Sequence, residues 1–232
     1  AHLNDERFDE DREELIELLR QRDVDLVVNP GADMETSKTA LDLANKYDFI
    51  YAAVGVHPHD VEDMTEEDID QLKKWAKEND KVVAIGEIGL DYYYDNSPRD
   101  LQKKWFIRQI ELANELGLPF IVHDRDAHGD TFEIIKKYKA PETGCVLHCY
   151  SGELELAKEY IKLGCHISIA GTVTFKNNRK TVDVAKNIPL EWMFIETDSP
   201  YLAPVPNRGK RNDPSMVRHV AEKIALERGI SR

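Results

Sequence analysis

The sequence has few cysteines, no long apolar run and no leader-like start, and each absence excludes a class of protein. Its three cysteines cannot all pair, which favours free thiols in a reducing compartment. No stretch approaches the roughly 18 apolar residues that a membrane helix needs. The first residues, AHLNDE, lack the character of a signal peptide. We therefore expect a cytoplasmic protein without a membrane anchor.

The sequence also lacks an excess of positive charge. Its 31 basic and 44 acidic residues give a net charge of −13, which argues against a protein that coats nucleic acid through a basic surface. An enzyme that holds nucleic acid through a local basic region is still compatible with this charge. The surplus of carboxylates also suits a protein that binds divalent cations.

No linker or low-complexity segment interrupts the chain, and its length suits one α/β barrel domain over residues 1–232. Short apolar runs rich in Val and Ile alternate with amphipathic stretches whose apolar residues repeat with helical spacing. The runs are continuous rather than alternating, which is typical of parallel strands buried on both faces. They occupy residues 25–29, 50–56, 82–86, 119–122, 145–147, 166–170 and 193–195.

Seven strand–helix units can be counted, whereas a (β/α)8 TIM barrel has eight. Because His2 is followed directly by a helical pattern, we expect strand 1 of the barrel to lie before Ala1, and the last helical stretch, from about Pro214, runs to Arg232. Both ends therefore read as truncated. A doubly wound sheet is the alternative fold, and the lack of a Gly-rich turn after an early strand disfavours it.

Histidines and carboxylates follow the predicted strands at the positions where the strands end. Because the carboxyl ends of barrel strands open on one face, these side chains should converge there. Three imidazoles and two carboxylates suit Zn, Mn, Mg or a similar ion, and a bridging carboxylate allows one or two cations. The predicted metal ligands are His2, Glu87, His123, His148 and Asp198.

Taken singly, each of these residues has an ordinary structural interpretation, such as a turn or a carbonyl cap. Their joint placement favours a site, because buried charges are costly unless they are paired or bound to metal. Four other histidines do not follow the pattern and are predicted to lie outside the site; they are His59, His128, His166 and His219.

Basic residues occur in three loops on the same predicted face, which indicates a locally basic opening that attracts phosphate. They are Arg125 and His128 in the first loop, Lys176, Arg179 and Lys180 in the second, and Arg208, Lys210 and Arg211 in the third. Tyr92, Tyr93 and Tyr94 lie on this side as well. They suit either stacking on bases or packing against a loop.

Several motifs resemble those of the TatD family of metal-dependent deoxyribonucleases, which belongs to the amidohydrolase superfamily. The resemblance spans essentially the whole chain in order. Its motifs are GVHP at 55–58, GEIGLD at 86–91, HDRDA at 123–127, HCYSG at 148–152 and ETDSPYLAP at 196–204. The resemblance implies metal ligation by Glu87, His123, His148 and Asp198. It further implies an opening His-x-His pair, of which this chain holds the second member, His2.

The resemblance also implies substrate contacts near His57, Arg125 and Tyr201. Combined with the basic loops, it leads to a hypothesis in which Arg125, Arg208 and Arg211 hold phosphate oxygens of DNA. Glu87 bridges the cations, and a metal-activated water attacks phosphorus while Asp198 takes its proton.

Two alternatives stay open at this point. One is hydrolysis of a small amide, lactone or ester, which related barrels perform. The other is a non-catalytic DNA-binding or metal-binding protein. We expect a monomer in each case.

Overall fold

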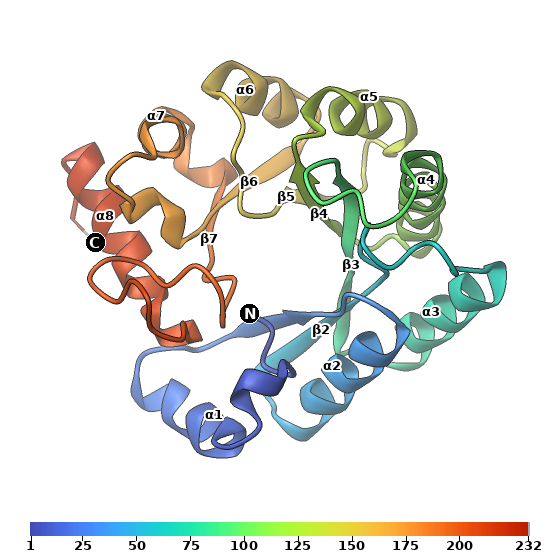
Figure 1. The fold of residues 1–232 in the computed structure, drawn as a ribbon, viewed down its shortest axis with the longest axis horizontal. Helices are drawn as coiled ribbons and strands as arrows, with labels where there is room; N and C mark the ends of the chain where they lie inside the picture. Colours follow the sequence, from blue (N-terminus) through green and yellow to red (C-terminus); the bar gives the residue numbers. More distant parts are fainter. Residues whose placement is uncertain (232) are drawn as a thin grey trace.

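The computed structural model describes residues 1–231 as a ring of parallel strands enclosed by helices (Figure 1). The strands pair in sequence order from β1 to β7. They are β1 Val27–Pro30, β2 Ile50–Val54, β3 Val82–Asp91, β4 Phe120–Arg125, β5 Cys145–Leu147, β6 Cys165–Ile169 and β7 Met193–Ile195. The helices are α1 Arg12–Gln21, α2 Met34–Lys46, α3 Glu66–Glu78, α4 Arg99–Leu116, α5 His128–Tyr138, α6 Leu154–Lys162, α7 Arg179–Asn187 and α8 Val217–Arg228. This is the TIM-barrel-like α/β fold that the alternating pattern predicts, with seven of its strands present.

The seam between β7 and β1 holds the start of the chain. Each of these strands has one strand neighbour in the described sheet. The amino group of Ala1 donates to Val28 O at 3.3 Å, and His2 N–H donates to Ser199 O at 2.7 Å. These two bonds place His2 between β1 and the segment after β7, at the carboxyl ends of the strands.

Two strands extend further than their apolar runs predict. β3 continues through Asp91, because after a register irregularity Ile88 to Asp91 pair with Val122 to Arg125 of β4. The polar residues at these strand ends point into a site rather than to solvent, so the end of the apolar run does not mark the end of the strand. His123 is therefore held by strand pairing opposite Gly89, whereas Glu87 lies in the irregular step of β3, where its N–H donates to Gly31 O at 3.0 Å.

The helices bury the stripes that the sequence predicts. Phe106 and Ile110 of α4 and Tyr160 of α6 are fully buried against the strands. α3 begins after a cap at Thr65, where the Asp68 carboxylate accepts the Thr65 N–H at 2.8 Å. Within residues 1–231, no helix combines the length and apolarity that crossing a bilayer requires.

The final helix is shorter than predicted. α8 ends at Arg228, and Gly229 follows with a φ of 65°. This left-handed conformation ends the helix, and glycine adopts it without steric cost. The predicted end at Arg232 lies outside the described residues.

Two buried glutamines of α4 hold the backbone beside the carboxyl ends of β2 and β3. Gln109 accepts the Val56 N–H at 2.8 Å and donates to Val56 O at 3.0 Å. Gln102 makes the same two hydrogen bonds to the backbone of Asp91: it accepts the Asp91 N–H at 2.9 Å and donates to the Asp91 carbonyl at 3.2 Å. Both side chains are inaccessible to solvent, so the amides satisfy backbone groups that water cannot reach.

We expect Gln109→Leu to lower the free energy of unfolding by about 2–4 kcal/mol, because it leaves two buried backbone groups of Val56 without partners. Urea unfolding followed by circular dichroism measures the change. Gln21→Leu, at an exposed position of α1, serves as the control. If Gln109→Leu lowered the free energy of unfolding by no more than the control does, the two hydrogen bonds from Gln109 to the Val56 backbone would contribute nothing to stability.

Candidate metal centre

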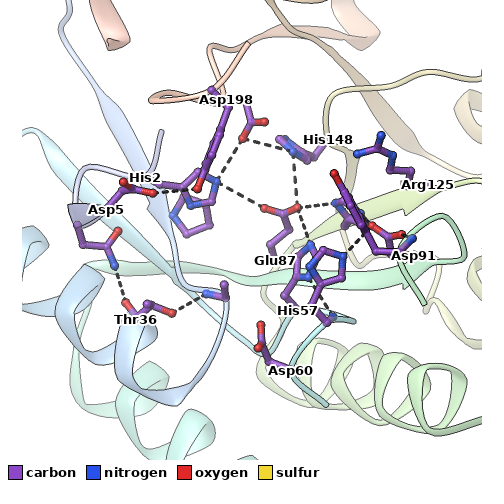
Figure 2. A pocket seen from close by; sticks show the side chains of 17 residues that line it. His2, Asp5, Thr36, His57, Asp60, Glu87, Asp91, Arg125, His148 and Asp198 are labelled. Atoms are coloured by element: carbon purple, nitrogen blue, oxygen red, sulfur yellow. Dashed lines mark hydrogen bonds and ion pairs between the residues drawn. The ribbon is translucent and has the colours of Figure 1, made fainter. Parts of the chain in front are cut away.

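A cavity of about 450 Å³ opens at the carboxyl ends of the strands (Figure 2). Its walls include all five predicted metal ligands, His2, Glu87, His123, His148 and Asp198. These residues come from segments far apart in the sequence, and the parallel strands deliver them to one place. The convergence predicted from the strand-end pattern is therefore what the structure has.

Glu87 lies at the middle of this group and is 3% exposed. Its Oε1 lies 3.0 Å from His123 Nδ1, 3.6 Å from His148 Nε2 and 3.7 Å from His57 Nε2. Its Oε2 lies 3.9 Å from His2 Nε2. The two oxygens of one buried carboxylate thus face imidazoles on two sides, which is the position that a bridging ligand needs.

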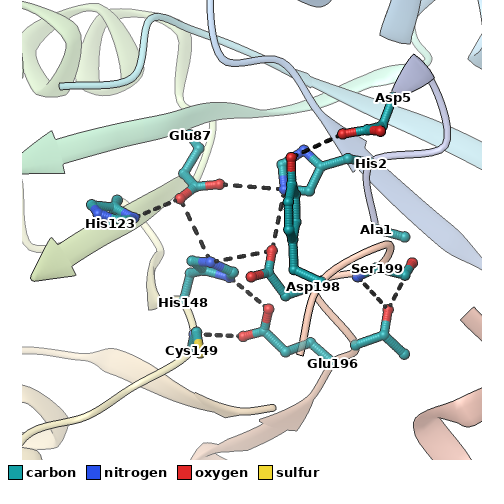
Figure 3. Close-up of polar contacts among 12 residues, drawn as sticks. Ala1, His2, Asp5, Glu87, His123, His148, Cys149, Glu196, Asp198 and Ser199 are labelled. Atoms are coloured by element: carbon teal, nitrogen blue, oxygen red, sulfur yellow. Dashed lines mark hydrogen bonds and ion pairs between the residues drawn. The ribbon is translucent and has the colours of Figure 1, made fainter. Parts of the chain in front are cut away.

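Asp198 approaches the same centre from the segment after β7 (Figure 3). Its Oδ1 lies 3.2 Å from His2 Nε2 and 3.7 Å from His148 Nε2. Asp198 has a φ of 55°, a conformation that Asp tolerates better than most residues. This backbone turn presents the carboxylate to His2 and His148.

Two carboxylates that the predicted ligand set omits orient the imidazoles. Glu196 Oε2 lies 2.5 Å from His148 Nδ1, while its Oε1 accepts the Cys149 N–H at 2.6 Å. Asp91 Oδ2 lies 2.9 Å from His123 Nε2. In each pair the carboxylate takes one ring nitrogen and leaves the other to face Glu87, an arrangement that fixes the tautomer of metal-binding histidines. Both acids lie inside the quoted motifs, but their role depends on spatial pairing.

The charges of the group are mutually stabilised. Burial alone would raise the pKa of Glu87, yet the imidazoles of His148, His123 and His57 hold it well below its usual range. Burial alone would lower the pKa of His123, but the carboxylates of Asp91 and Glu87 raise it to about 9. Burial would also lower the pKa of His148, but the carboxylates of Glu196, Glu87 and Asp198 raise it well above the ordinary value. Without a bound cation, protons on the imidazoles thus balance the carboxylates.

His57 differs from the other imidazoles. Its Nδ1 accepts the backbone N–H of His59 at 3.1 Å, so in the neutral ring the proton sits on Nε2, which points toward Glu87. Burial, followed by the nearby charge of His123, holds the pKa of His57 well below its usual value. His57 is therefore a neutral ring with a hydrogen-bond donor aimed into the cavity.

The expectation that His59 lies outside the site is wrong. His59 lines the cavity, and its Nε2 lies 2.9 Å from Asp91 Oδ2. A turn from His57 to Asp60, closed by a 2.9 Å backbone hydrogen bond, brings both histidines inward. Spacing along the chain did not reveal this. His166, by contrast, packs on Trp192 and Phe194 within the barrel wall.

The remaining predicted site residues fall into two groups. Arg125 and Tyr201 line the cavity. Arg208 and Arg211 are not among its lining residues in the described chain: Arg208 stacks on Phe175 at 3.6 Å, and Arg211 forms an ion pair with Asp11 at 2.5 Å. Their predicted contact with phosphate stays a prediction.

The expected basic opening is a weaker feature than the loops suggested. Among the residues described, Arg125 is the one arginine or lysine in the lining, whereas five carboxylates and five imidazoles line the same cavity. Lys180 pairs with Glu153 instead. Lys180 and Arg211, which the sequence pattern placed at the opening, thus form ion pairs with nearby carboxylates instead.

The donor set fits a metal ion. Ligand atoms of Glu87, His123 and His148 all lie within 4.8 Å of one another, a spacing that suits an ion bound at about 2.0–2.2 Å from each donor. Nitrogen and oxygen donors of this kind bind Zn, Mn and similar cations. When His123 and His148 each lose one proton, the tautomers that Asp91 and Glu196 fix leave a lone pair on the nitrogens that face Glu87.

Comparisons with known proteins agree with this chemistry. A model of the family described as TatD related DNase matches residues 1–232. The chain is 49% identical over 225 residues to YabD of Bacillus subtilis (strain 168), an uncharacterized metal-dependent hydrolase, covering 97% of this chain and 88% of YabD. It is 39% identical over 229 residues to YcfH of Escherichia coli (strain K12), which carries the same description, covering 99% and 85%. The crystal structure of YjjV, a TatD homologue from Escherichia coli K12, superposes with a TM-score of 0.91 at 32% identity, covering 97% and 87%.

We expect the apparent affinity for Mn²⁺ to rise as the pH is raised from 6.5 to about 9, because protonated His123 and His148 must lose their protons to bind metal. Isothermal titration in buffers of different ionisation enthalpy measures both the affinity and the protons released. An affinity and a proton count that stay constant over this range would contradict the assignment of these imidazoles as ligands.

We expect Asp91→Asn to weaken Mn²⁺ binding by about 10–100-fold, because the amide no longer fixes the His123 ring as a carboxylate does. Asp126→Asn, at an exposed position on the same face, is the matched control. Equal affinity of the two variants would show that Asp91 does not position His123 for metal.

Proposed function

Because the chain belongs to the TatD family of metal-dependent hydrolases, we propose that it is a deoxyribonuclease that hydrolyses phosphodiester bonds of DNA. The observation that carries the proposal is one cavity whose walls hold both the Glu87-centred donor set and the guanidinium of Arg125. A phosphodiester needs this combination, because its negative charge must be neutralised while its phosphorus is attacked.

The proposed metal-holding residues divide into two groups that share Glu87. His2 lies on the side of Glu87 Oε2 and His123 and His148 lie on the side of Oε1, while Asp198 Oδ1 faces both His2 and His148. A divalent cation bound in such a group supplies Lewis acidity, lowers the pKa of a coordinated water and neutralises phosphate charge. Glu87 then joins the two groups, and Asp91 and Glu196 keep the imidazoles in the tautomer that exposes a lone pair.

Asp198 is the proposed proton acceptor. Its Oδ1 faces His2 and His148, and its side chain is 16% exposed, so a water entering the cavity can reach the other oxygen. A carboxylate within hydrogen-bond reach of the attacking water removes its proton as the bond to phosphorus forms. The backbone turn at Asp198 holds the carboxylate at the edge of the donor set.

Neutral and cationic donors around the centre are the proposed phosphate contacts. His57 offers its Nε2–H beside Glu87, and Arg125 offers a guanidinium whose planar donors match phosphate oxygens. Tyr201 stands at the rim, where its hydroxyl donates to Asp5 at 2.9 Å and its ring meets His2 edge-on. These side chains act on a phosphodiester by binding and orienting it.

We expect Glu87→Gln to reduce release of nucleotides from single-stranded DNA in Mg²⁺ or Mn²⁺ by more than the roughly 100-fold that loss of a ligand-orienting partner causes, because the shared anionic ligand is removed. Glu62→Gln, at an exposed position, is the control. Denaturing gel electrophoresis of end-labelled oligonucleotides measures the rate.

Equal rates for the protein and Glu87→Gln would assign any DNA cleavage to a contaminant. A protein that leaves DNA intact but hydrolyses members of a panel of amides, lactones and carboxylic esters would overturn the deoxyribonuclease proposal. That outcome would leave the assignment as a metal-dependent hydrolase intact.

A further inference from the structure

Two tyrosines stand exposed at the edge of the metal-centre cavity, directly after β3. Tyr93 and Tyr94 are 58% and 54% exposed, and their rings meet edge to face at 4.9 Å. Tyr92 behaves differently: its hydroxyl donates to Asp130 at 2.6 Å, and Arg99 covers its ring at 4.1 Å. Tyr92 is therefore a packing residue, whereas Tyr93 and Tyr94 present ring surface to solvent.

The exposed pair is attached to the metal centre through a single carboxylate. Asp91 Oδ1 accepts the backbone N–H of Tyr93 at 3.0 Å and of Tyr94 at 2.9 Å. Asp91 Oδ2 lies 2.9 Å from both His123 and His59. Because Asp91 is fully buried, it holds the tyrosine turn at a set position relative to the ligand His123.

A cation completes the arrangement. The guanidinium of Arg125 lies 4.0 Å from the centre of the Tyr93 ring and 4.9 Å from that of Tyr94. The pairing of Asp91 with Arg125 in the β3–β4 register brings them together. Tyr94 also meets His59 edge-on at 5.4 Å, so its ring stands one imidazole away from the donor set.

We propose that Tyr93, Tyr94 and Arg125, here called the tyrosine platform, bind one unpaired nucleotide beside the cleaved linkage. The base stacks on the Tyr94 ring while Arg125 contacts the adjoining phosphate. Both are ordinary modes of single-strand recognition, and stacking accepts any base. A base within a duplex has both faces covered by its neighbours, so the platform selects single-stranded over double-stranded substrate. This inference rests on the proposed nuclease function.

The test measures binding of single-stranded DNA hexamers that carry 2-aminopurine at one position at a time, with phosphorothioate linkages that slow cleavage. The protein, Tyr93→Ala/Tyr94→Ala and Tyr93→Phe/Tyr94→Phe are compared. We expect fluorescence quenching at one position by the protein and by the Phe variant. The Ala variant should lose that quenching and bind about 10-fold or more weakly, as removal of a base–aromatic stack does.

A second arm replaces the nucleotide at the quenched position with an abasic residue and follows cleavage of the ordinary phosphodiester. The abasic change should raise KM for the protein by about 10-fold with kcat retained, and should leave KM of the Ala variant unchanged. The same sequence as a duplex should be cleaved more slowly than the single strand by the protein, and the Ala variant should lose this preference.

The outcomes separate the two proposals. If the protein cleaves DNA and the Ala variant matches it in affinity, quenching and response to the abasic site, the platform is wrong and the nuclease function stands. If the protein neither binds nor cleaves the oligonucleotides, both proposals fail. Loss of binding in the Phe variant as well would also overturn the inference, because the ring faces are then not what is recognised.

Discussion

A buried negative charge at Glu87 is the constraint on which the site depends. A carboxylate with 3% exposure is costly unless opposite charge or hydrogen bonds surround it. Here the imidazoles of His2, His57, His123 and His148 approach its two oxygens. The curled parallel sheet brings His2, from the start of the chain, and the three imidazoles at the carboxyl ends of β2, β4 and β5 around this one pair of oxygens. The fold therefore supplies the partners that the buried charge needs.

The imidazoles around Glu87 are themselves held in place by further hydrogen bonds. Asp91 and Glu196 hold the second nitrogens of His123 and His148, and Gln102 holds the backbone of Asp91 from α4. Asp91 also anchors the turn that carries Tyr93 and Tyr94. One helix, through its buried amides, thus supports both the proposed metal ligands and the proposed binding surface beside them. A substitution at Gln102 should therefore affect both the position of His123 and the turn that carries Tyr93 and Tyr94.

The family membership and the fold agree with what the motifs implied, but the structure redistributes the roles of individual residues. His59 and Asp91 belong to the cavity, although His59 was expected elsewhere. Arg211 serves an ion pair with Asp11, which reduces the basic opening that the loops had indicated. In each case a partner distant in sequence decides the outcome: Asp91 for His59, and Asp11 for Arg211. Residue type and position relative to a strand do not reveal which distant residue becomes the partner.

The amino-acid sequence by itself determined the seven parallel strands and the five residues that converge at their carboxyl ends. Continuous Val- and Ile-rich runs are typical of parallel strands, although Leu26, Phe194 and Ile195 beside the seam are exposed, and parallel strands leave their following residues on one face. Only the tertiary structure decided where β3 and β4 end, which nitrogen of each histidine faces Glu87, and which arginines remain available to a ligand. These features depend on hydrogen bonds and ion pairs between segments far apart in the chain, and position in the sequence does not specify which of these partners meet.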